Sequence, residues 1–174
     1  MIAPLPEWTE NYKSVFFGEY TAADQPLQYR KFVHKSFSGV QAAPPYQSTP
    51  TLQEMAFPPY MPPCPGTPVT AATLLASCWM SYINATVWST PPPIPPFSLI
   101  ALMCFDPASV SAANTALIAD LVAEFTVISE GDAKASGIAK CFYKASKSLM
   151  LMATGTSLPS PTPVPLVVPG LPVL

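Results

Sequence analysis

The chain has few charged residues, and those few are unevenly distributed. Asp, Glu, Lys and Arg make up 10% of the 174 residues, against about 25% in an ordinary soluble domain. Residues 55–105 and 148–174 contain none of them and no histidine. The 8 basic and 10 acidic residues form no basic block, which a nucleic-acid-binding protein or a membrane-surface segment would show. We therefore expect no nucleic-acid partner.

Residues that carry catalysis or bind metals are also scarce. His34 is the single histidine, and the cysteines at 64, 78, 104 and 141 form no C-x-x-C pair. A structural zinc site needs four closely placed ligands of these types. No glycine-rich phosphate-binding loop is present either. We predict buried free thiols, no catalytic residue, no cofactor and no metal site.

Two groups of residues have a functional interpretation as well as a structural one. His34 follows Arg30-Lys31 and is either a general base or a surface residue of a strand. Four carboxylates are either a metal or acid–base site or a solvated helix face with its own cap. They are Asp120, Glu124, Glu130 and Asp132. The structural interpretation is the simpler one for both groups.

No secretory signal is expected, because the start MIAPLPEWTEN has neither a basic n-region nor an apolar h-region. Residues 69–88 are the one stretch long enough to cross a membrane, which takes about 20 apolar residues. This stretch contains six polar residues, Thr70, Thr73, Ser77, Ser81, Asn84 and Thr86. A core or interface helix is therefore the better interpretation.

What the chain does have is apolar residues and proline. The hydrophobic fraction is 49%, enough for a core, and there are 24 prolines. So much proline argues against a compact all-helical or all-sheet protein. We predict an α+β fold, with a core of about three helices, a few short strands and long irregular proline-rich arms. The expected division is an N-terminal arm over 1–66, a core over 67–154 and a tail over 155–174.

Within the core, capping residues and proline predict the helices. Thr67-Pro68 and Asp106-Pro107 each place a capping side chain before a proline at the first helical position. A third helix is expected over 129–147, with Ser129 and Asp132 resembling a capping box. The apolar runs 97–105 and 148–153 are predicted strands, which could pair through the intervening helical hairpin.

The N-terminal region is predicted to be extended. Pro4 and Pro6 indicate an arm over residues 1–11, and aromatic and β-branched residues over 14–20 and 29–37 predict a two-stranded ribbon. Nine prolines over 41–68 predict polyproline-like chain.

The tail, LPSPTPVPLVVPGLPVL, is uncharged and contains six prolines. It would expose many apolar side chains if it were free, and stiff chain loses little entropy when it docks. We therefore predict partner-binding residues in both chain ends: Ile2, Leu5, Trp8, Leu158, Val164, Leu166, Val168, Leu171 and Leu174.

A small core with apolar proline-rich arms resembles, in layout, the minor structural proteins of virus particles, especially those of the neck, tail or baseplate of tailed phages. The resemblance implies a non-enzymatic virion component, assembled in the host cytoplasm, with protein subunits as homo- or hetero-oligomeric partners. One alternative is a membrane-associated protein that uses residues 69–88 and the tail. Another is a small enzyme or ligand-binding domain that uses Asp120 and Glu124.

Overall fold

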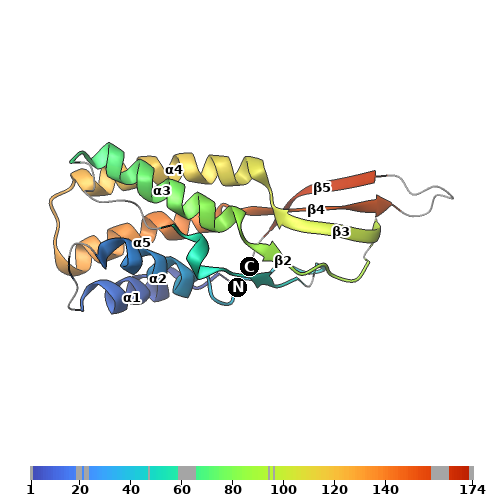
Figure 1. The fold of residues 1–174 in the computed structure, drawn as a ribbon, viewed down its shortest axis with the longest axis horizontal. Coiled ribbons are helices and arrows are strands. Elements are labelled where there is room, and N and C mark those ends of the chain that lie inside the picture. The colour runs from blue at the N-terminus through green and yellow to red at the C-terminus, as the bar shows by residue number, and fades with distance from the viewer. Residues whose placement is uncertain are drawn as a thin grey trace.

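A computed structural model describes residues 2–18, 21, 24–46, 48–58, 66–93, 95, 97–157 and 165–172. It confirms the α+β class. A body of helices occupies one end of an elongated molecule, and a sheet projects from the other end (Figure 1). The elements in chain order are α1 (Leu5–Phe16), α2 (Gln25–Phe37), β1 (Pro50–Thr51), the 3-10 helix η2 (Glu54–Ala56), α3 (Pro68–Asn84), β2 (Val87–Trp88), β3 (Phe97–Phe105), α4 (Pro107–Thr126), α5 (Gly131–Lys147), β4 (Met150–Ser157) and β5 (Pro165–Pro172).

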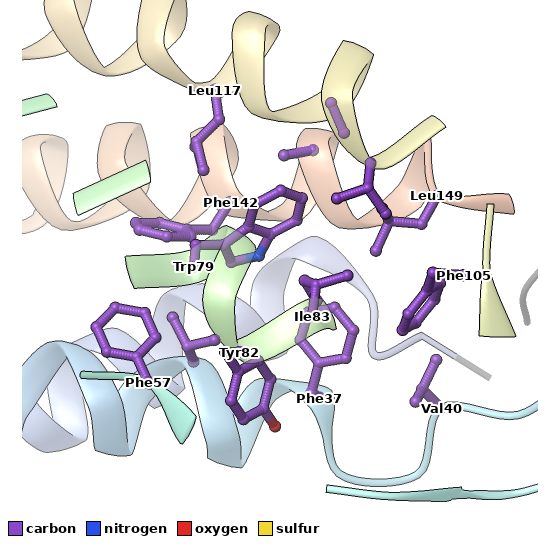
Figure 2. Close-up of a cluster of buried hydrophobic side chains, with 14 of the residues drawn as sticks. Phe37, Val40, Phe57, Trp79, Tyr82, Ile83, Phe105, Leu117, Phe142 and Leu149 are labelled. Carbon is purple, nitrogen blue, oxygen red and sulfur yellow. The ribbon is translucent and has the colours of Figure 1, made fainter. Parts of the chain in front are cut away.

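The helical body is built on the antiparallel hairpin of α4 and α5. Helix α3 packs against α4, while α1 packs against both α5 and α2. Large side chains from these helices meet in one buried cluster, part of which is drawn in Figure 2. Trp79 and Phe142 lie at its centre, and Leu117 of α4 is fully buried above them. The apolar stripe of each helix therefore faces a shared core.

Two of the predicted helix starts are confirmed. The Thr67 hydroxyl accepts a hydrogen bond from the Thr70 N–H at 3.3 Å, and the Asp106 carboxylate accepts one from the Ala108 N–H at 3.2 Å. The predicted capping box at Ser129 is wrong, because α5 begins after Glu130 without a side-chain cap. Gly131, the first residue of α5, has a φ of 56°, a conformation that glycine adopts without strain.

The predicted N-terminal arm and two-stranded ribbon are wrong. These residues form α1 and α2 instead. Pro6 lies in the first turn of α1, where a missing N–H leaves no hydrogen bond unmade. Trp8, Tyr12 and Phe16 recur every four residues and are all buried. This helical spacing, rather than the β propensity of the aromatic residues, decides the local structure.

The predicted division between an arm and a core is not seen in the packing either. The Trp8 and Phe32 rings lie 5.8 Å apart, and Phe32 lies 5.5 Å from Phe142 of α5. Helices from residues 1–66 thus contribute to the same core as helices from 67–154, and the described chain has five α-helices instead of about three. Part of the proline-rich segment is also anchored, since the buried Arg30 Nε donates to the Phe57 carbonyl at 2.9 Å.

The strands form two small antiparallel sheets. Strands β1 and β2 pair as a two-stranded sheet, and the larger sheet has the order β3-β4-β5. Both predicted strands are confirmed, and they do pair, with Phe105 opposite Leu151 and Met103 opposite Ala153. In the tail, residues 165–172 form the edge strand β5 against β4 of the same chain.

The larger sheet is a direct continuation of the α4–α5 hairpin. Strand β3 leads into α4 through Asp106, and β4 follows α5. The Asp106 N–H donates to the Met150 carbonyl at 2.8 Å, and the Met150 N–H donates to the Ser109 hydroxyl at 3.1 Å. These bonds fix the sheet to the start of α4, so that it projects from the body in a defined direction (Figure 1).

Candidate functional site

Two irregularities in β3 decide which side chains share a face of the larger sheet. The pairing shifts register between Phe97 and Leu99 and again between Ile100 and Leu102. Each shift places one extra residue in β3, as a β-bulge does. Because paired residues point to the same side of a sheet, the register assigns the described side chains to two faces. The inner face carries Phe97, Ile100, Met103, Phe105, Leu151, Ala153, Val168 and Leu171, and the outer face carries Leu99, Leu102, Cys104, Met150, Met152, Thr154, Thr156 and Val167.

The inner face belongs to the hydrophobic core. Its β3 and β4 side chains are buried, and Val168 and Leu171 of β5 pack against them. The Phe105 ring lies 5.3 Å from the Trp88 ring in an edge-to-face arrangement. The side chains of the inner face are therefore covered by other residues of the same chain.

The outer face is apolar but exposed. Leu99 is 57% exposed, Leu102 50% and Val167 55%. The three strands contain no Asp, Glu, Lys, Arg or His. A sheet with one face in water normally alternates apolar and polar residues, whereas a sheet covered on both sides has near-continuous apolar strands. Strand β3 and the first half of β4 have the sequence of strands covered on both sides, although only one side is covered by the described chain, and Thr154 and Thr156 are the polar residues of the outer face.

The two edges of this sheet differ. Strand β5 carries Pro165, Pro169 and Pro172, and proline protects an edge because it cannot donate a backbone hydrogen bond. Strand β3 has neither proline nor charge. In the part of the chain that the structure describes, β3 pairs with β4 alone. No described strand is hydrogen-bonded to the outer edge of β3, although β2 contacts β3 and its Trp88 packs on Phe105.

A second apolar region lies at the far end of the helical body. The end of α1, the start of α3 and the α4–α5 connection all lie at the end away from the sheet (Figure 1). They carry the exposed residues Phe17, Val69, Val127 and Ile128. Ile128 is 99% exposed. We call the surface formed by these four residues the far end of the helical body, or the far end for short.

The predicted partner-binding residues are dispersed. Trp8 is fully buried, so its prediction as a surface anchor is corrected: its ring fills the core between α1, α2 and α5. Ile2 and Leu5 are partly exposed. Val168 and Leu171 lie on the inner face, and Leu166 is paired with Gly155 in β5. Leu158, Val164 and Leu174 lie outside the described residues.

The exposed residues Leu99, Leu102 and Val167 were not among the predicted sites. The signal for them was present, because β3 is uncharged along its whole length. Simple alternation would have placed Leu99 with Phe97 and Met103 on one face, whereas the register shifts separate them.

The acidic candidates are engaged in ion pairs. A groove between α4 and α5 is lined by Asp120, Ala123, Glu124, Val127, Ser136, Gly137, Lys140, Cys141 and Lys144. The Lys144 Nζ lies 3.2 Å from Asp120 and the Lys134 Nζ 3.6 Å from Glu124. Lys134 also donates to the carbonyl oxygens of Glu124 and Val127. It thereby occupies acceptors that the end of a helix leaves unpaired.

The groove contains no activated nucleophile. The Cys141 thiol donates to the Gly137 carbonyl at 3.2 Å. Burial, together with the nearby Asp120 and Glu124 charges, raises the pKa of Cys141 to about 12. A thiol that stays protonated is a poor nucleophile and a poor metal ligand. Among the residues that the structure describes, no cluster of His, Cys, Asp and Glu could hold a metal ion.

Of the remaining candidates, Asp132 and His34 make contacts between helices, and Glu130 is the N-cap residue of α5 without a side-chain cap. Asp132 lies 3.1 Å from Lys13 and so links α5 to α1. His34 lies in α2, not in a strand, and its Nδ1 is 3.1 Å from the Tyr82 hydroxyl. Burial, and to a lesser extent the Glu54 charge, raise the pKa of Tyr82 well above its usual range. The Tyr82 hydroxyl therefore stays protonated while it joins α3 to α2.

No helix among the described residues is both long enough and apolar enough to span a bilayer. The chain matches no protein-family model, and comparison with curated proteins and with solved structures finds no match. Function must therefore be inferred from the residues of this chain.

Proposed function

We propose that this chain is a non-enzymatic structural subunit of a multi-subunit protein assembly, and that its outer face is buried against another protein subunit. One observation carries the proposal: a sheet without a single charged residue leaves one apolar face exposed. Contiguous exposed apolar surface on a soluble chain marks a contact site.

The energetics favour a covered outer face. Fully burying a leucine or valine side chain contributes about 1.5–3 kcal/mol relative to leaving it in water. Leu99, Leu102 and Val167 are each half exposed or more. Covering them and the flanking methionines would contribute several kcal/mol by the same area estimate, before the entropy lost on association is subtracted.

The far end supports the same function. It lies at the opposite end of the molecule from the sheet (Figure 1). A subunit with apolar surfaces at both ends can contact two neighbours at once, which is what extended assemblies require. A subunit of a closed pair needs one such surface only.

A virus particle is the assembly that we propose. The support is the composition, with 24 prolines and two long uncharged segments, which resembles that of minor virion proteins. The partners would be copies of this chain or other virion proteins, met in the host cytoplasm during assembly.

The proposal is tested by the mass of the native complex. The tagged full-length chain would be recovered from the cells that produce it and its mass measured by native mass spectrometry before any denaturing step. We expect a mass well above the 18.6 kDa of one chain. A solitary chain in this measurement would overturn the proposal.

A matched pair of variants tests the surface. Leu99→Lys combined with Val167→Lys places charge on the outer face, where both residues are exposed. We expect this variant to remain folded and to be lost from the complex. The control Ala116→Lys changes an exposed residue of α4, and we expect it to assemble normally. Flotation of the wild-type chain with liposomes, without any protein complex, would favour the membrane alternative instead.

A further inference from the structure

We infer that the open edge of β3 pairs with β3 of a second copy of this chain, antiparallel across a two-fold axis, so that two three-stranded sheets join into one. The inference names the first partner of the proposed assembly subunit and rests on that proposed function.

One edge of β3 has backbone N–H and C=O groups that are not paired with any strand among the described residues. An edge strand presents a row of N–H and C=O groups that template pairing with another strand. Proteins protect such edges with charge, with proline or with a covering element. Strand β3, with the sequence FSLIALMCF, has neither charge nor proline. Strand β2 contacts β3 through Trp88 and Phe105 but belongs to the other sheet and does not pair with it. Its two register shifts lie in the first half of the strand, which leaves Leu102–Phe105 in regular pairing with Thr154 to Leu151. The regular half is therefore the part best suited to accept a new strand.

The chemistry of β3 suits a second copy of itself. Like charges directly opposite each other across two strands are destabilising, whereas apolar pairs are favourable. Two copies of β3 bring no charge together, because neither has any. A two-fold axis makes each contact occur twice, so the surface has to complement itself. An uncharged apolar strand meets that requirement in the antiparallel direction.

The other edge explains why pairing would stop at two copies. If both edges of the sheet were open, edge pairing would continue into a fibre. Strand β5 closes its edge with Pro165, Pro169 and Pro172. Each chain therefore offers one edge, and the product is a closed dimer with a β5 strand at each side.

Pairing at β3 would also create a larger outer face. Leu99 and Leu102 of each copy would lie beside the seam, since both belong to the exposed side of β3. The outer faces of two copies would form one continuous apolar surface. This surface is what the next subunit of the assembly would cover.

The test uses the full-length chain alone in solution. Sedimentation equilibrium over a range of concentrations should give a dimer of twice 18.6 kDa. Leu102→Lys introduces charge on the open-edge strand, and Val167→Lys introduces it on the same face but on the protected strand, at similar exposure. We expect Leu102→Lys to raise the dimer dissociation constant about tenfold or more, as charge on an edge strand does. Val167→Lys should leave it within about twofold.

Hydrogen exchange provides a readout that needs no substitution. Peptides covering residues 97–105 should exchange more slowly as the protein concentration rises, while peptides from α3 should not change. Helical circular dichroism of each variant checks that it remains folded.

Each outcome of these measurements either supports or overturns the pairing of two β3 edges. Equal loss of the dimer in both variants would show that two outer faces stack, which overturns edge pairing. A chain that remains monomeric at every concentration also overturns it. A monomer in solution that is still recovered in a large native complex leaves the proposed function standing, whereas a solitary native chain removes both.

Discussion

The carbonyl group of Leu99 in β3 packs directly against the backbone of Gly155 in β4. A Cβ added at Gly155 would lie 2.9 Å from the Leu99 carbonyl carbon and 3.0 Å from the Ile100 Cα, and closer still to the Leu99 oxygen. This contact lies between the two register shifts of β3. The shifts, which decide the composition of the outer face, thus depend on a residue without a side chain.

Gly155→Ala is expected to destabilise the protein. The obstructing atoms are backbone, so the strands must separate, and overpacking of this kind costs about 1–3 kcal/mol. Urea unfolding followed by circular dichroism measures the free energy of unfolding. Gly18→Ala is the matched control, because a Cβ there has no atom within 4 Å, and it should change stability by less than about 0.5 kcal/mol. Equal effects of the two substitutions would contradict the register assigned to β3.

Gly137→Ala is expected to behave differently, although its Cβ would also collide with a neighbour. The obstruction is the carboxylate of Glu124, the mobile end of a side chain and the partner of Lys134. Replacing a helical glycine by alanine gains about 1 kcal/mol, and losing the partly exposed ion pair costs about 0.2–1 kcal/mol. We expect a net change close to zero in the same urea titration; a loss as large as that of Gly155→Ala would show that the carboxylate cannot move.

Lys134→Met should destabilise the α4–α5 hairpin. This substitution removes an ammonium group that donates a hydrogen bond to the Val127 carbonyl at the end of α4 and forms an ion pair with the Glu124 carboxylate. Loss of a capping interaction of this kind costs about 0.5–2 kcal/mol. Lys140→Met on the same helix is the control, since Lys140 is exposed. A thermal melt that ranks Lys140→Met as the more damaging change would rule out this role for Lys134.

Trp8→Ala distinguishes a core residue from a partner anchor. Trp8 is fully buried and lies 5.8 Å from Phe32. Removal of such a side chain costs about 3–5 kcal/mol, so we expect the isolated chain to lose most of its stability. Phe17→Ala, at a residue 55% exposed, should cost far less. A Trp8→Ala variant of normal stability that fails only to assemble would restore the anchor interpretation.

Stability should fall in alkaline solution, partly through Cys141. Its thiol has a pKa of about 12 when folded, against 9.0 for an ordinary thiol. Between these values the unfolded chain has lost a proton that the folded chain retains. The contribution is therefore fully present below pH 9 and is lost as the pH rises toward 12. Cys141→Ala removes this titration, so its free energy of unfolding should decline less above pH 9 than that of the wild type; parallel declines would contradict the assignment.

The local signals between residues 67 and 154 were sufficient to predict α3, β3, α4, α5 and β4, whereas the strand β5 in the tail was not predicted. Capping by Thr67 and Asp106, each followed by proline, marks the start of α3 and α4 because side-chain capping depends only on neighbouring residues. The uncharged run 97–105 similarly indicates β3. By contrast, the proline and aromatic residues of the first 40 positions predict extended chain, whereas the structure has the helices α1 and α2 there. The four-residue spacing of Trp8, Tyr12 and Phe16 was the signal for α1.

By itself the sequence determined the α+β class, the helical hairpin that carries the larger sheet, and the absence of charged residues from the three strands of that sheet. These follow from caps, spacing and composition, which act over a few residues. Only the tertiary structure decided that Leu99 and Leu102 face outward together while Trp8 is enclosed. The register of β3 is set by backbone contacts with β4, and the enclosure of Trp8 is set by helices distant in sequence, so neither is encoded in any single stretch of chain.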